Sequence, residues 1–91
     1  MITNSDIVQI FRSGVPTGRK VAVRQIHQIV EKSWTLSEAD WEPHPCEVAR
    51  GSVYPAWKRK VQAVLHDLNR RRKVQHFPVS HEYIFDSSSL D

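Results

Sequence analysis

The chain has 91 residues, of which 40% are hydrophobic, and a formal net charge of +3. This length suits a single domain with one modest core and leaves too little chain for a deep catalytic cleft as well. The one cysteine, Cys46, excludes an internal disulfide, and no apolar run reaches the ~20 residues of a membrane span, so we expect a cytoplasmic protein without a membrane contact.

The charge is distributed unevenly along the chain. Residues 54–77 contain seven basic side chains and one acid, a local charge of +6, so the rest of the chain carries −3. Residues 31–47 contain five acids and one base. A molecule with one basic side attracts polyanions such as nucleic acid, and that attraction weakens as salt is added. The simpler alternative is a basic helix that only faces solvent.

Two helices and a strand are predicted in the first part of the chain. Apolar residues recur at helical spacing over residues 4–13, and a glycine and a proline then stop the helix. Residues 20–23 favour a brief strand. A second helix is expected over residues 23–34, with an apolar side and a polar side that includes His27.

Residues 35–53 form a long connection, in which only residues 36–40 favour a turn of helix. A connection of this length without structure of its own is often functional. Trp41 lies there among acids and prolines, where the pattern does not require it in the core. Asp40 and Glu42 are predicted to be two acids of this loop, without a lysine nearby.

A third helix is predicted over residues 55–71, with Pro55 at its first position. Strands at 74–77 and 83–85 follow, joined by a loop at 78–81. The helical stripe and the strands supply the predicted core residues, which are Trp57, Val61, Val64, Leu65, Leu68, Phe77, Tyr83 and Phe85.

This order of elements predicts an α+β domain over residues 1–86. Three helices closed by a hairpin are typical of a winged helix-turn-helix with a two- or three-stranded antiparallel wing sheet. Residues 87–91 are expected to be a flexible tail or the start of a linker.

The side of the third helix opposite its apolar stripe is the candidate DNA-reading face. In the major groove, Arg pairs with guanine and Gln pairs with adenine. The face carries Arg59, Gln62, Ala63, His66 and Arg70, with Lys58 beside it. Contacts to DNA phosphates are expected around it, from Arg24, Ser52, Tyr54, Arg70, Arg72, Lys73 and the wing residue His81.

Catalytic chemistry is not found in these patterns. His44 and Cys46 are too few for a structural zinc site, which takes four ligands. No glycine-rich phosphate loop or activated nucleophile is present. We therefore expect a non-catalytic domain that needs no metal and no cofactor.

The segment from Leu36 to Phe85 resembles the winged-helix domains attached to restriction endonucleases, such as the amino-terminal domain of Mrr-like enzymes. The winged helix of DpnI-like methyl-directed enzymes is similar in kind. The residues that carry the resemblance are 36–40 (LSEAD), 57–61 (WKRKV), 64–68 (VLHDL), the basic turn after them and 83–85 (YIF). In two places the chain departs from the family: residues 71–73 replace a usual glycine, and the wing at 78–81 lacks glycine.

The resemblance implies a module that reads double-stranded DNA for an attached or associated nuclease domain. It also implies a preference for methylated DNA, such as N6-methyladenine, with Trp41 or Tyr54 contacting the methyl group. The rival interpretation is a winged helix that binds a protein partner, or a small transcription regulator. The acidic region and Trp41 would then form the contact surface.

Overall fold

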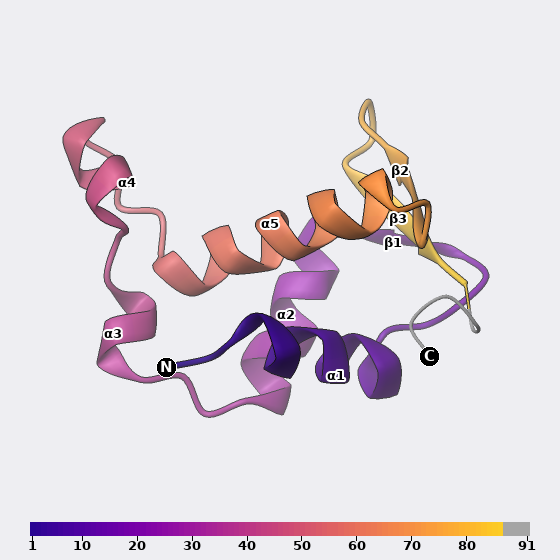
Figure 1. Ribbon diagram of the computed structural model, residues 1–91, viewed down its shortest axis with the longest axis horizontal. Helices are drawn as coiled ribbons and strands as arrows, with labels where there is room; N and C mark the ends of the chain where they lie inside the picture. The colour runs from indigo at the N-terminus through magenta and orange to yellow at the C-terminus, as the bar shows by residue number, and fades with distance from the viewer. Residues whose placement is uncertain (87–91) are drawn as a thin grey trace.

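The computed structural model describes residues 1–86, and the predicted tail at 87–91 lies outside the described residues. The described part contains five helices and one three-stranded sheet, which confirms the α+β class. In chain order the elements are α1 (Asn4–Gly14), β1 (Lys20–Ala22), α2 (Val23–Ser33), α3 (Glu38–Trp41), α4 (Pro45–Ala49), α5 (Ala56–Arg70), β2 (Val74–Phe77) and β3 (Glu82–Phe85) (Figure 1).

The sheet is antiparallel, with strand order β1-β3-β2. The predicted hairpin is present, because β2 pairs with β3 from Val74↔Phe85 to Phe77↔Glu82. The predicted strand near residue 20 is also present, and it joins the other edge of β3. The strand β1 and the β2–β3 hairpin, which are far apart in the sequence, therefore form one sheet beside the end of α5 (Figure 1).

The core lies between the three long helices and one face of the sheet. Each helix contributes the apolar stripe that its spacing predicts, and Phe11 of α1 meets Phe85 of β3 edge to face, with ring centroids 5.3 Å apart. Phe77 is an exception to the predicted core. The pairing register places it on the opposite face of the sheet from Val74, where it is half-buried and the Lys20 ammonium lies 4.5 Å from its ring centroid.

The long connection is more ordered than predicted. The expected turn at its start is α3, which begins two residues later than the predicted turn, but a second helix, α4, was not expected. The His44 imidazole Nδ1 accepts a hydrogen bond from the Cys46 N–H at 3.2 Å, and Pro45 occupies the first helical position. His44 and Cys46, the two possible metal ligands in the sequence, therefore lie together at the start of α4.

Asp40 is not the solvated acid that the sequence predicted. Its side chain is 1% exposed and accepts hydrogen bonds from the N–H of Ile2, at 3.1 Å, and from the N–H and hydroxyl of Ser37, both at 3.0 Å. Burial alone raises the pKa of this carboxyl, but the hydrogen bonds from Ser37 and Ile2 outweigh it, so the net pKa is lowered.

Ile2 connects the N-terminal segment to α3 and α5. Its side chain is fully buried, its N–H donates to Asp40 of α3, and its carbonyl accepts a hydrogen bond from the Lys60 ammonium of α5 at 2.8 Å. The N-terminal segment thus runs beside α3 and α5 (Figure 1). The helical turn α3 is attached to the core through these contacts.

We predict that Asp40→Ala lowers the free energy of unfolding by about 2–3 kcal/mol, because it leaves the buried N–H of Ile2 and the part-buried donors of Ser37 without an acceptor. The measurement is urea denaturation at pH 7. Glu42→Ala, which removes an exposed carboxylate two residues away, is the matched control and should change stability by less than about 0.5 kcal/mol. Equal losses in the two variants would show that the hydrogen bonds to Asp40 contribute no stability of their own.

Candidate nucleic-acid interface

The predicted DNA-reading face is the outer side of α5. Because the helix turns 100° per residue and buries Trp57, Val61 and Leu65, it leaves other positions on the surface. Four of the predicted residues are exposed there: Gln62, Ala63, His66 and Arg70. In Figure 1, α4 and the β2–β3 hairpin extend past α5 on the side away from α1.

The basic run at the end of α5 divides into paired and unpaired cations. Asp67 forms ion pairs with Arg70, at 2.7 Å, and with Arg71, at 3.2 Å. Within residues 1–86, no carboxylate lies within ion-pair distance of Arg72 or Lys73. The positive charge available to an anion is therefore concentrated at these last two residues.

Arg72 ends α5 in the conformation that usually belongs to glycine. Its φ is +59°, and the N–H of Lys73 then donates to the Leu68 carbonyl at 2.8 Å, which closes the helix end. An L-residue in this region costs roughly 1–2 kcal/mol. Arg72 therefore adopts, at this helix end, the left-handed turn that a glycine would adopt.

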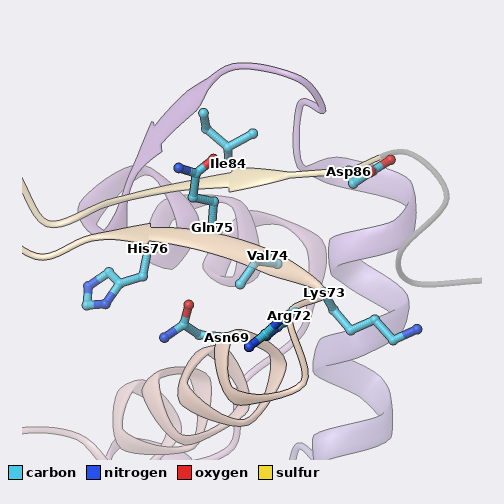
Figure 2. Close-up of a pocket in the computed structure, with 8 residues that line it drawn as sticks. All are labelled: Asn69, Arg72, Lys73, Val74, Gln75, His76, Ile84 and Asp86. Carbon is cyan, nitrogen blue, oxygen red and sulfur yellow. The ribbon is translucent and has the colours of Figure 1, made fainter.

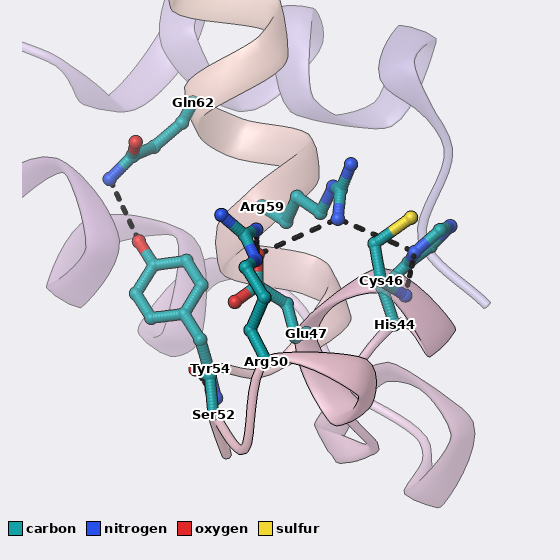
Figure 3. A network of polar contacts seen from close by, with 8 residues as sticks. All are labelled: His44, Cys46, Glu47, Arg50, Ser52, Tyr54, Arg59 and Gln62. Atoms are coloured by element: carbon teal, nitrogen blue, oxygen red, sulfur yellow. Dashed lines mark hydrogen bonds and ion pairs between the residues drawn. The ribbon is translucent and has the colours of Figure 1, made fainter.

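The N-terminal half of α5 faces α4, and this contact was not predicted. Arg59 Nη1 lies 3.5 Å from the Glu47 carboxylate and 3.4 Å from His44 Nδ1, and Glu47 also pairs with Arg50 at 2.6 Å (Figure 3). Arg59 was predicted to be a base reader on an open face. It is instead half-buried and shares its charge with an acid from the connection.

Ser52 and Tyr54 lie beside the same half of α5. The Gln62 amide donates to the Tyr54 hydroxyl at 2.8 Å, and the Ser52 hydroxyl accepts from the Tyr54 N–H at 3.1 Å (Figure 3). Burial and the Glu47 carboxylate raise the pKa of Tyr54 despite the bond from Gln62, so its phenol stays neutral. Each group keeps a hydrogen-bonding atom for a ligand, since the Gln62 carbonyl and the Tyr54 O–H are not used in this pair.

The two residues predicted to contact a methyl group do not form one site. Trp41 is 43% exposed and packs edge to face against the buried Trp57, with centroids 5.5 Å apart. Tyr54 is connected to that pair only through His27, whose ring lies 6.5 Å from that of Tyr54 and 5.6 Å from that of Trp57. Of the two, only Tyr54 adjoins the polar side chains of the outer face.

The remaining predicted contacts lie around α5. Lys58 is half-buried, with its ammonium 5.6 Å from the centroid of the Trp57 ring. Arg24 is exposed in the first turn of α2. His81, in the turn between β2 and β3, is exposed at φ +53°, and its carbonyl accepts a hydrogen bond from the Val23 N–H at 2.9 Å. This turn is thus formed without glycine.

His27 was predicted on the polar side of α2, but it is half-buried between Tyr54 and Trp57. Burial, and then the positive charge of Lys58, lower the pKa of His27 to about 4. His27 Nε2 and Trp57 Nε1 have no hydrogen-bond partner among the described residues. No sequence signal marks this residue, because its burial depends on how Tyr54 folds back over α2 and α5.

Within the described range, no three His, Cys, Asp or Glu side chains gather closely enough to hold a metal ion. No helix of residues 1–86 is both long and apolar enough to cross a membrane. Comparisons of the chain with protein-family models, with curated proteins and with solved structures give no match.

The lowered pKa of His27 predicts a loss of stability in mild acid. The unfolded histidine takes up a proton near pH 6.5, whereas the folded one resists protonation until about pH 4, so its contribution is complete above pH 6.5 and is lost as the pH falls through this window. Allowing for screening of a half-buried group, the loss is about 1–2 kcal/mol.

The measurement is the free energy of unfolding of the wild type and of His27→Leu at pH 7 and pH 5. We expect the difference between the two pH values to shrink in the variant. His81→Gln, at an exposed histidine, is the control and should keep the wild-type difference. An unchanged pH dependence in His27→Leu would contradict the assignment.

Proposed function

We propose that the chain is a winged-helix module that binds double-stranded DNA, with α5 in the major groove. The observation that carries the proposal is the outer face of α5, where exposed Gln62, Ala63 and His66 lead to Arg72 and Lys73, two cations without an ion-pair partner among residues 1–86. A polar helix face with a small residue can approach base edges, and cations at its end can neutralise phosphates.

The order of the elements supports the winged-helix assignment. The β2–β3 hairpin is preceded in the chain by α1, the short strand β1, and the long helices α2 and α5. The sheet, with strand order β1-β3-β2, lies beside the end of α5 (Figure 1). The turn between β2 and β3 corresponds to the wing. The short helices α3 and α4 are insertions between α2 and α5 in this scheme.

In the proposed complex, different residues have different roles. Gln62 and Arg59 read base edges, with His66 beside them, while Ala63 allows close approach. Phosphates are held on both sides of the groove by the cations and hydroxyls around α5, which are Arg24, Ser52, Lys58, Arg70, Arg72, Lys73 and His81. The chain itself is non-catalytic in this proposal and directs an attached or associated nuclease domain in the cytoplasm.

We predict salt-dependent binding of the full chain to duplex DNA, with a slope of log affinity against log salt of about −0.9 for each phosphate contacted. Arg59→Ala should weaken binding to a duplex enriched from a random pool by about 1–3 kcal/mol, because a bidentate pair with guanine is lost. Fluorescence anisotropy at several salt concentrations measures both quantities.

Lys32→Ala is the control matched in charge, because Lys32 is exposed in the last turn of α2 and lies outside the proposed contacts. Affinity that does not depend on salt, or equal effects of Arg59→Ala and Lys32→Ala, would contradict reading by α5. The same titration with N6-methyladenine, 5-methylcytosine or unmodified duplexes decides whether the module is modification-dependent. Burying one methyl group contributes about 0.8 kcal/mol, so Tyr54 alone would give only a few-fold preference.

We also predict that Glu47→Gln strengthens DNA binding by about two- to fivefold. Glu47 holds a negative charge beside Arg59, where DNA phosphates would approach, and its neutralisation removes the repulsion and releases the guanidinium. Glu38→Gln, in the first turn of α3, is the control. Weaker binding by Glu47→Gln than by Glu38→Gln would instead mean that Glu47 holds Arg59 in its reading position.

The second candidate function is protein binding, and one observation favours it. Three of the large exposed hydrophobic residues lie in or beside α3 and α4: Trp41, at 43% exposure, Val48, at 61%, and Val53, at 84%. Exposed apolar side chains near an acidic segment suit a protein partner. A salt-independent interaction that is lost in Trp41→Ala, together with no affinity for duplex DNA, would support this function over DNA binding.

A further inference from the structure

The end of α5 and the start of β2 border an open pocket that none of the base-reading roles uses. It has a volume of about 440 Å³ and is lined by polar and basic side chains from both elements, with Val74 and Ile84 at its apolar side. Figure 2 shows that Asn69, Arg72 and His76 point into the same space between α5 and β2, whereas Lys73 extends away from it.

Ring and backbone contacts order parts of this pocket. The His76 ring is stacked on the Tyr83 ring, with centroids 4.5 Å apart and planes 11° from parallel, and the His66 ring lies 6.3 Å from it. Asn69 belongs to the last turn of α5, and its carbonyl accepts the Arg72 N–H at 3.0 Å. These contacts order the His76 imidazole and the backbone of Asn69 and Arg72 at the pocket.

The chemistry of the three donors suits an oxyanion. A guanidinium offers paired N–H groups, an amide offers an N–H₂ group and an imidazole offers an N–H. Within residues 1–86, no carboxylate neutralises Arg72. Asp67 pairs with the neighbouring Arg70 and Arg71, and Asp86 lies at the far end of the pocket (Figure 2).

The backbone of Arg72 is a second, independent observation. Among the described non-glycine residues, only Arg72 and His81 have a positive φ. Glycine would adopt the same helix end without strain, so the strain at Arg72 accompanies a side chain that glycine lacks. Strained positions of this kind concentrate at ligand-binding sites.

We propose that Arg72, Asn69 and His76 bind one phosphate group, and that in the DNA complex this group is a backbone phosphodiester beside the groove that α5 reads. This inference rests on the proposed function for the source of the phosphate, but the pocket itself is tested separately. It assigns Arg72 a ligand-binding role, and its left-handed backbone directs the guanidinium under β2 rather than along the axis of α5.

Arg72→Gly is the decisive variant, because it removes the guanidinium and relaxes the backbone at once. We expect its Tm to rise by a few degrees, its affinity for duplex DNA to fall roughly tenfold, and its salt slope to flatten by about 0.9. Arg71→Ala, which removes an arginine already paired with Asp67, is the matched control and should change affinity less than about threefold. A fall in Tm would show instead that Arg72 stabilises the fold, and it would overturn the proposal.

His76→Phe tests the pocket without altering the helix end. Phenylalanine keeps the ring stacked on Tyr83 but has no N–H, so duplex affinity should fall several-fold with little change in Tm. Unchanged affinity and salt slope in both His76→Phe and Arg72→Gly would overturn the phosphate site, while salt-dependent binding by the wild type would leave the proposed function standing.

The full chain is also titrated with inorganic phosphate, and with sodium chloride at equal ionic strength, while the NMR signals of Arg72 and His76 are followed. Saturable shifts with phosphate alone, lost in Arg72→Gly, support a site that also takes the free anion. No shifts with phosphate, together with weakened duplex binding by the variant, support a site that requires the DNA backbone. Phosphate binding without any duplex binding would retain the pocket and refute the proposed function.

Discussion

The burial of Trp57 determines which way α5 faces. Its ring is fully buried, packed edge to face against Trp41 on α3 and against His27 on α2, so the helix cannot rotate without breaking contacts to both. Loss of such a large aromatic side chain from a core typically costs 3–5 kcal/mol. The orientation of the outer face, the placement of Tyr54 over His27 and the attachment of α3 all follow from this one packed ring.

The two halves of the outer face differ in charge because of what lies beside them. At the start of α5, Glu47 brings a carboxylate to Arg59 and removes much of its effective positive charge. At the other end, Arg72 and Lys73 have no such partner within residues 1–86. A polyanion is therefore attracted chiefly to the sheet side of the helix, while the α4 side offers hydrogen-bonding groups.

Sequence patterns predicted the parts of this fold that depend on local periodicity. The stripe from Trp57 to Leu68, the hairpin and the three long helices were recognisable because 3.6- and 2-residue periods mark buried faces. The surroundings of Asp40, Arg59 and His27 were not foreseen because their partners are distant in the chain or lie in α4, which is too short to show a period. Phe77 was assigned to the core because residue type alone does not tell which face of a strand is buried. Whether Arg59 or Gln62 contacts a base is still a prediction.

The hydrogen bond from the Val23 N–H to the His81 carbonyl has a mechanical consequence. Val23 is the first residue of α2, so the tip of the hairpin is fastened to the beginning of a core helix rather than left as an independent flap. A force on the β2–β3 turn is therefore passed through this bond to α2, which carries His27 against the ring of Trp57. The turn, α2 and the N-terminal turn of α5 form one mechanically connected unit, so a displacement of the turn reaches the surroundings of Tyr54.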